Sequence, residues 1–195
     1  MRVAGPGRLG SMTEPGPVAH VEDPSCAVAH GAVPQPTAEK TLVAVFASPV
    51  ARYLLQYGRD IGFRAILVEP DADRRAAFCQ EQSQFRDAEF VKAVPEELDG
   101  SVDLVATDHH RPELGVLLRD ALLTKSRWIG VLGNPRHPGP HVEMLRELGV
   151  ADEDVARVHR PVGLNIGSRT PPEIAIAVLA GILADRNDRP GGFEF

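Results

Sequence analysis

Cysteine, aromatic residues and excess positive charge are all scarce in this 195-residue chain. Its two cysteines, Cys26 and Cys79, lack the spacing of metal ligands, and nothing in the sequence pairs them, which favours a reduced cytoplasmic protein. No apolar run is long enough to span a bilayer, and the N-terminus has no signal-peptide stretch, so we expect a soluble chain without membrane contact. A formal net charge of -6 argues against nucleic acid as a partner.

Composition divides the chain into three parts. Residues 1–40 are interrupted by proline and glycine and show neither helical nor strand periodicity, which predicts an N-terminal extension of low order. Residues 41–188 have the length of one α/β domain, and residues 189–195 form a short tail.

Apolar runs of strand length alternate with amphipathic segments along residues 41–188. The expected strands cover residues 41–47, 64–69, 89–94, 103–108, 127–133 and 157–163. The expected helices cover residues 49–62, 71–82, 112–125, 141–150 and 171–186. This alternation predicts a Rossmann-like, doubly wound α/β fold with a mostly parallel sheet.

Ligands of such folds bind at the carboxyl ends of the strands. The first strand leads into FASPVA, where Phe46 and Ser48 occupy the glycine positions of a dinucleotide fingerprint and only Ala51 fits. Their Cβ atoms crowd the place of a pyrophosphate. Glu69 ends the second strand 21 residues after Ser48, about where a ribose-binding acid is found. We favour the alternative that Glu69 is an ordinary solvated carboxylate.

The fourth strand ends in TDHH, which offers Thr107, Asp108, His109 and His110. An aspartate beside two imidazoles could bind a metal ion or move a proton. Adjacent histidines of an extended chain point to opposite faces, however, and cannot easily hold one ion. A helix-capping role for Asp108 or a histidine is an equally good interpretation.

Two further polar segments, GNPRH and HPGPH, follow the fifth strand. Gly133 permits a tight turn, Asn134 offers an amide, and Arg136 presents a forked cation to an anion. A plain turn with a surface arginine explains the same residues equally well. His137 and His141 are four residues apart, but the prolines between them break the helix that would align them for a metal.

The last candidate is the segment RPVGLNIGSRTPPEI before the final helix. Thr170 and Glu173 have the spacing of a capping box, and the two intervening prolines remove N–H donors from the helix start. An anion would therefore have to be bound by residues 167–170 themselves. The helix that follows is rich in small and apolar residues, which predicts burial in the core or against a second subunit of a homodimer.

WIGVLGNPRH, ATDHH and RVHRPVGLNIGSRTPPEIAIAVLAGILADR together resemble the C-terminal Rossmann domain of the xanthine dehydrogenase accessory proteins, the XdhC/CoxI family. The resemblance covers residues 41–188. It implies a bacterial accessory factor that binds the molybdenum cofactor, holds it during sulfuration and passes it to an apo molybdenum hydroxylase, with a cysteine desulfurase as a second partner. It gives no catalytic role to the chain itself.

The sequence also departs from the family pattern. FASPVA replaces a glycine-rich loop close to GAGHVA, Asn165 replaces an aspartate, and Asp108-His109 inverts the usual order. Gly181 stands where glutamate is common. No counterpart of the family's N-terminal domain is recognisable, so we expect a single-domain member in which Cys26 has no functional role.

Three functions follow from this sequence. The first is the accessory, cofactor-binding role, with NAD(P) not expected as the cofactor. The second is an NAD(P)-dependent oxidoreductase, and the third a ligand-free Rossmann module that acts through protein contacts, with Phe46 filling the space of the ligand's phosphates. No catalytic or metal-binding residue is assigned. The predicted cofactor-binding residues are Ser48, Glu69, Thr107, Asp108, His110, Gly133, Asn134, Arg136, Gly163, Asn165, Gly167, Ser168 and Thr170.

Overall fold

A computed structural model of the chain describes residues 27–28, 30–31, 39–80, 88–134, 136 and 139–192. The chain divides into two units, residues 1–38 and 39–195. Most of the predicted N-terminal extension, together with Cys26 and His137, lies outside the described residues.

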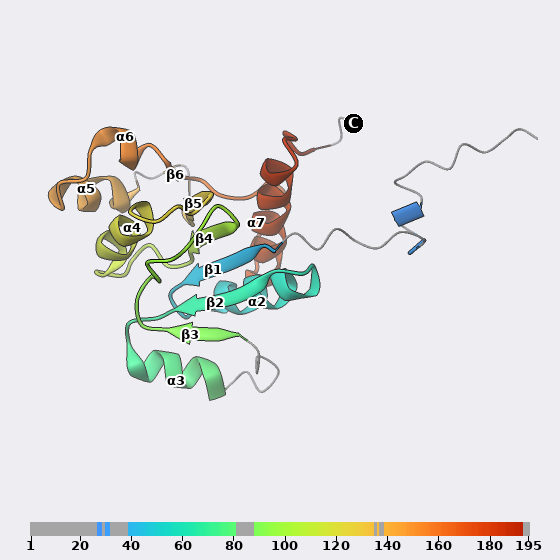
Figure 1. Cartoon of the computed structure of the whole chain (residues 1–195), viewed down its shortest axis with the longest axis horizontal. Helices are drawn as coiled ribbons and strands as arrows, with labels where there is room; N and C mark the ends of the chain where they lie inside the picture. The colour runs from blue at the N-terminus through green and yellow to red at the C-terminus, as the bar shows by residue number, and fades with distance from the viewer. Residues whose placement is uncertain are drawn as a thin grey trace, which may run out of the picture. The chain divides into compact units, whose positions relative to one another are not determined.

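A six-stranded sheet in the order β3-β2-β1-β4-β5-β6 forms the centre of this unit (Figure 1). Every pairing between neighbouring strands is parallel. The prediction of a doubly wound Rossmann-like fold is therefore confirmed, with a sheet that is parallel throughout and not only mostly so. The strands are β1 (Thr41–Val45), β2 (Arg64–Val68), β3 (Glu89–Val91), β4 (Val102–Ala106), β5 (Trp128–Val131) and β6 (Val158–His159).

The helices lie on both faces of the sheet because alternate strand residues point to opposite sides. Val43 and Val45 of β1 pack into the core shared with α4, whereas Leu42 and Ala44 pack into the core shared with α2 and α7. Long apolar strands buried on both faces are typical of parallel sheets. The helices are α2 (Pro49–Asp60), α3 (Ala72–Gln80), α4 (Leu114–Leu122), α5 (Pro140–Glu147), α6 (Asp152–Val155) and α7 (Pro171–Arg186).

Helix α7 packs against α2 (Figure 1). Its residues Ala175, Val178 and Ile182 are buried in the core of the same unit. Burial in the core, one of the two interpretations of this apolar helix, accounts for its inner face. Helix α6 was not expected, because its four residues, Asp152–Val155, are too few to show a helical period.

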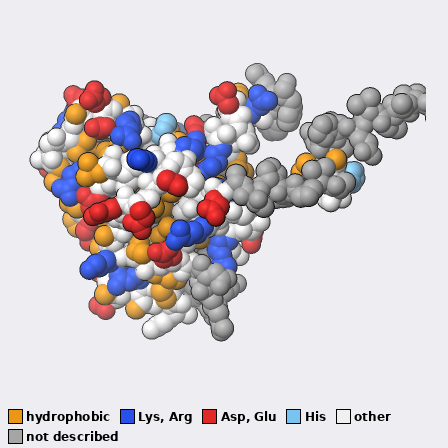
Figure 2. Space-filling model, viewed as in Figure 1, with side chains coloured by type: hydrophobic (Ala, Val, Ile, Leu, Met, Phe, Trp, Pro, Cys, Tyr) orange, Lys and Arg blue, Asp and Glu red, His pale blue; other side chains and the backbone are white. Residues whose placement is uncertain are grey.

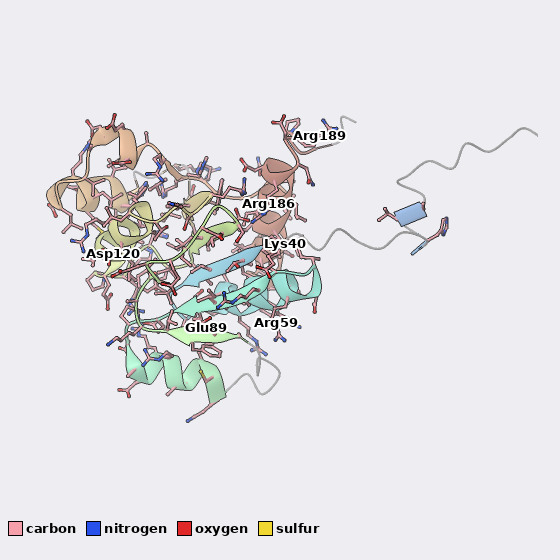
Figure 3. The ribbon with its side chains drawn as sticks, viewed as in Figure 1. Lys40, Arg59, Glu89, Asp120, Arg186 and Arg189 are labelled. Atoms are coloured by element: carbon pink, nitrogen blue, oxygen red, sulfur yellow. The ribbon has the colours of Figure 1, made fainter. Side chains whose placement is uncertain are left out.

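Charged side chains join the strands at the amino edge of the sheet, opposite the expected ligand edge. Asp103 of β4 is fully buried and accepts hydrogen bonds from Arg127 at 2.8 Å and from Arg186 at 2.6 Å. Burial raises the pKa of the Asp103 carboxyl, and the two guanidinium groups act in the opposite direction. Lys40 and Arg186 (Figure 3) both lie against the ring of Phe63. This network ties the end of α7 to the sheet.

Basic and acidic side chains are interspersed over the face shown in Figure 2. Among the helices of the described residues, none combines the length and apolar character needed to cross a bilayer.

Candidate functional site

The order in which the strands follow one another reverses between β1 and β4. At this switch point, outside the carboxyl ends of the two strands, ligands of this architecture usually bind. Two hydroxyl groups connect the loops at this point. Ser48 donates to Thr107 Oγ1 at 2.9 Å, and Thr107 Oγ1 lies within hydrogen-bonding distance of the carbonyl oxygens of Val45 and Phe46. The Ser48 hydroxyl also accepts the N–H of Ala51 and caps α2. Both predicted residues therefore hold the loop in shape.

Phe46 adopts a left-handed backbone conformation, with φ of 75°, although it is not glycine. Its side chain is fully buried and belongs to the core on the side of α4. Only the alternative of a ligand-free module expects this ring to fill the space of a ligand's phosphates, whereas the structure makes it a core side chain. Phe46 thus stands at the position of the first glycine of the fingerprint, and its backbone has the left-handed conformation that usually requires glycine.

Glu69 is fully buried, so its interpretation as a solvated carboxylate is wrong. Arg111 binds its carboxylate in a bidentate manner, at 3.2 and 3.1 Å, and the guanidinium lies 4.7 Å from the centre of the Phe46 ring. The same carboxylate accepts the N–H groups of Ala47 at 2.8 Å and Asp71 at 3.0 Å. Glu69, at the position of a ribose-binding acid, is therefore bound to Arg111 and to the N–H of Ala47, which lies in the loop where a pyrophosphate would bind. We call this region around Glu69, Arg111 and Ala47 the closed crevice.

We expect NAD(H) and NADP(H) to bind weakly, with dissociation constants above about 0.1 mM. The acid and a loop N–H are already paired with protein groups, and displacing Arg111 from Glu69 would leave the buried carboxylate without its counter-charge. Isothermal titration calorimetry of the purified chain measures this directly. Micromolar binding would contradict the expectation and favour the oxidoreductase.

A pocket of about 440 Å³ lies beside this closed crevice, between the start of α2, the helix α3 and the start of α7. Ser48, Arg52 and Tyr53 line it from α2 and the preceding residue, and Arg74 and Phe78 line it from α3. We call it the lateral pocket. Its volume is that of a small-molecule site.

A second cavity, of about 350 Å³, lies at the opposite edge, where Lys40, Arg64 and Ser101 are among its lining residues. It is a cleft of mixed charge, lined also by Glu89 and Asp99. Ligands of parallel sheets bind at the carboxyl ends of the strands, so we place the candidate site at the lateral pocket.

The residues after β4 turn away from an extended path. The ring centres of His109 and His110 are 4.1 Å apart, which contradicts our expectation that adjacent histidines point to opposite faces. Asp108 Oδ1 accepts the N–H of His110 at 2.9 Å and so stabilises this local turn. Burial, with a further contribution from His110 and Arg160, lowers the pKa of His109. Within the described residues, no group of His, Cys, Asp or Glu side chains has the geometry of a metal site.

The turn after β5 is organised by an arginine that the sequence did not single out. Arg160 donates to the carbonyl oxygen of Asn134 at 3.0 Å, and its guanidinium lies so close to Gly133 that a Cβ atom there would meet Cζ at 2.8 Å. Asn134 Oδ1 accepts the N–H of Arg136 at 3.0 Å, and residue Arg136 is exposed. The absence of a side chain at Gly133 leaves the room that the Arg160 guanidinium occupies.

Gly163, in the loop before α7, is a packing residue. It has a φ of +85°, and a Cβ atom there would lie 2.8 Å from the carbonyl carbon of Ala177 in α7. The next residue, Leu164, donates its N–H to the oxygen of Ala177 at 3.0 Å. Gly181, where the family often has glutamate, lies directly against Gly163, since a Cβ on it would be 2.9 Å from the Gly163 Cα.

In the outer part of the same loop, backbone N–H groups bind the carboxylate of Glu173, a residue of the first turn of α7. Glu173 accepts the N–H groups of Arg169 at 2.7 Å and Thr170 at 3.2 Å, which completes the predicted capping box. These two hydrogen bonds lower the pKa of Glu173, and the bond from the N–H of Arg169 makes the larger contribution. Gly167 has the expected left-handed conformation, with φ of +71°, in open space. Two of the N–H donors that we expected to face a ligand are therefore used by Glu173.

The predicted residues thus fall into three groups. Ser48, Glu69 and Thr107 lie together at the switch point, and Ser48 alone among the thirteen lines the lateral pocket. Asp108, His110, Gly133, Asn134 and Arg136 follow β4 and β5. Gly163, Asn165, Gly167, Ser168 and Thr170 precede α7, where Asn165 is exposed and the Ser168 hydroxyl lies 3.4 Å from the carbonyl oxygen of Glu173.

Four arginines were missed: Arg52, Arg74, Arg111 and Arg160. One of them left a signal in the sequence. Arg52 follows Ser48 by four residues, a spacing that places both on one face of the helix after the first strand. Arg111 and Arg160 have no such periodic relation to the residues that they contact.

The chain was compared with known families and proteins. A family model described as the XdhC Rossmann domain matches residues 42–182. The uncharacterized protein YqeB of Escherichia coli (strain K12) is 44% identical over 109 residues, which cover 54% of this chain and 19% of that protein. The chain therefore spans only a small part of this curated relative.

A solved structure gives a further likeness. It is described as a xanthine dehydrogenase from Bacillus halodurans, determined at 2.80 Å resolution, and it superposes with a TM-score of 0.59. The match is 21% identical in sequence and covers 80% of this chain and 45% of that one. At this level of identity the likeness shows the fold.

Proposed function

Because the chain belongs to the XdhC Rossmann-domain family, we propose that it is an accessory protein of molybdenum hydroxylases and that it binds the molybdenum cofactor at the carboxyl edge of its sheet. The observation that carries this proposal is the family match over residues 42–182, which include almost the whole folded unit and its C-terminal loop. Under this proposal the apo hydroxylase and a cysteine desulfurase are the partners.

The residues of the carboxyl edge fit such a cofactor, which combines a tricyclic pterin with a phosphate group. The Arg52 Nε atom is buried and has no hydrogen-bond partner among the described residues, so it is a donor still available to an anion. The lateral pocket has room for a molecule of this class. Ser48, Arg52 and Arg74 would bind the phosphate, and the bound group would supply the molybdenum chemistry of the receiving enzyme.

The chain's own contribution is to bind and shield the cofactor. Guanidinium groups neutralise phosphate and direct it by fixed donor geometry. A pocket between two helix starts and a third helix removes part of the ligand from water. This is the action of a carrier, and it requires no residue to exchange a proton with the substrate.

The oxidoreductase alternative is disfavoured because Glu69, at the sequence position of a ribose-binding acid, is buried and already paired with Arg111. The alternative of a ligand-free module makes the opposite prediction for bound pterin, so one experiment separates it from our proposal.

We expect the full chain, purified from cells that synthesise the molybdenum cofactor, to retain pterin. The measurement is the fluorescence of the oxidised pterin released on denaturation, expressed per mole of protein. The same chain from cells blocked in cofactor synthesis is the control. Equal signals from the two preparations would overturn the proposal and leave the protein-contact module.

A further inference from the structure

The cavity of about 350 Å³ at the amino edge of the sheet has no part in the proposed function. We call it the amino-edge cleft. Its floor comes from three neighbouring strands, since Thr41 of β1 is in register with Arg64 of β2 and with Val102 of β4. Residues in register on parallel strands point to the same face of the sheet, and Ile66, two residues after Arg64, lies on this face as well.

The inner part of the cleft is apolar. Ile66, Leu98 and Val102 belong to the core on the side of α4 and form its base. Pro95, from the segment between β3 and β4, lines the cleft and is only half-buried. These side chains offer a surface to a short hydrocarbon stem but no partner to a charge.

Both cations of the cleft are directed to other groups. Lys40 precedes Thr41, so its side chain lies on the other face of the sheet, where Nζ is 4.6 Å from the centre of the Phe63 ring (Figure 3). Arg64 forms an ion pair with Glu89 at 2.5 Å. Neither cation can bind an anion in the cleft without losing a contact that it already has.

Three carboxylates of the cleft have no such partner. Glu39, Glu97 and Asp99 line it, and none of them forms an ion pair with another described residue. Hydrogen bonds from Ser101 lower the pKa of Asp99, so this carboxylate is charged at neutral pH. The end of α2 adds to the negative field, because a helix C-terminus carries partial negative charge and Gly62, two residues after α2, lines the cleft.

A hydroxyl group of the cleft also lacks a partner. Thr41 is 7% exposed, and its Oγ1 atom forms no hydrogen bond with another described residue. The unpaired side-chain atoms that are fully closed off from solvent belong to other residues, so this oxygen is still reachable from the cleft. Buried hydroxyl groups are normally hydrogen-bonded, and an ammonium group, with three donors and no acceptor, would satisfy this one.

We propose that the amino-edge cleft binds an alkylammonium group, which donates to Thr41 Oγ1 and is neutralised by Glu97 and Asp99, with its hydrocarbon stem beside Pro95. A free amine and the lysine side chain of a partner protein share this chemistry. The site goes beyond the proposed function, because it lies at the edge of the sheet opposite the lateral pocket.

The test titrates the full chain with pentylammonium and follows binding by NMR chemical shifts. 1-Pentanol has the same stem without the charge, and ammonium chloride has the charge without the stem. We expect pentylammonium to bind at least tenfold more tightly than either, and its binding to weaken as the ionic strength rises. Equally tight binding of 1-pentanol would overturn the proposal.

Two variants test the residues that carry the site. Thr41→Val removes the hydroxyl and keeps a side chain favoured in strands, so it should weaken pentylammonium binding about tenfold, the lower end for a hydrogen bond to a charged group. Asp99→Asn keeps an acceptor for the N–H of Ser101 and should weaken binding about twofold to fivefold, because the carboxylate is exposed. Unchanged binding to Thr41→Val would overturn the proposal.

Asp152→Asn is the matched control. Asp152 is an exposed carboxylate that pairs with Arg146 and does not line the cleft, so its replacement should leave binding unchanged. A loss as large as that of Asp99→Asn would overturn the proposal, since it would show that the amine responds only to the overall surface charge.

Nα-acetyl-lysine N-methylamide distinguishes the two sources of the ammonium group. It has a stem of similar length and adds the peptide backbone of a protein. Binding as tight as that of pentylammonium identifies a lysine side chain as the ligand, and binding at least tenfold weaker identifies a free amine; either result supports the site. Thr41→Val should retain as much pterin as the unchanged chain, so failure of this proposal would leave the accessory function standing.

Discussion

Replacing Glu69 by glutamine is expected to lower the free energy of unfolding by about 3 kcal/mol, the lower end of the range for breaking one partner of a buried ion pair, because Arg111 keeps its pairing with Glu113. The carboxylate is fully buried, and the side chain of its partner Arg111 is 8% exposed, so the substitution removes the buried one of the two carboxylates that neutralise this guanidinium. The hydrogen bond from the N–H of Ala47 also depends on this carboxylate. Urea denaturation followed by circular dichroism gives the change.

Glu113→Gln is the control for this experiment. Glu113 pairs with the same Arg111 at 3.1 Å, but its side chain is 38% exposed. We expect it to cost at most about 1 kcal/mol, because solvent screens an exposed pair. The double variant Glu69→Gln/Arg111→Met should be more stable than Glu69→Gln alone, since it removes a guanidinium that has lost its buried counter-charge. A single-variant cost as small as that of Glu113→Gln would show that the pair does not hold this edge together.

The second large effect is expected at Gly163, where alanine should lower the free energy of unfolding by about 2–5 kcal/mol. About 1–2 kcal/mol comes from a side chain in the left-handed conformation. The rest comes from overpacking, typically about 1–3 kcal/mol, because the new Cβ would meet the backbone of Ala177 at 2.8 Å and backbone cannot rotate away.

Gly167→Ala separates the two contributions. Gly167 also has a positive φ, but a Cβ atom there has nothing within 4 Å. We therefore expect it to cost only the conformational part, and the difference between the two variants measures the close approach of loop and helix. Thermal and urea unfolding of both variants in parallel is the measurement. Equal costs would mean that the contact between Gly163 and α7 adjusts without strain.

These two sites matter for function because they shape the surroundings of the lateral pocket. Glu69 holds the loop from which α2 starts, and Gly163 holds the loop that leads to α7. Both helices begin at the pocket. A loss of pterin retention in either variant should therefore accompany loss of stability, whereas Arg52→Gln should reduce pterin retention with little change in unfolding.

The order of strands and helices was predictable from the sequence because it depends on local patterns. Apolar runs of about five residues between amphipathic segments predict buried parallel strands, and right-handed crossovers then leave few topologies. The capping box of Thr170 and Glu173 and the left-handed conformation at Gly167 are also local, since each depends on residues within one turn. The motifs in the second half of the chain carried the family resemblance.

The tertiary structure decided three features: the burial of Glu69, its pairing with Arg111, and the lateral pocket. Arg111 is 42 residues from Glu69, and Arg160 is 26 residues from the carbonyl that it contacts. Pro171 and Pro172 meet Arg52 in one pocket only because α7 packs beside α2. Spacing along a chain reports which residues share one helix face or strand, but contacts between elements depend on how the sheet brings distant loops to the same edge.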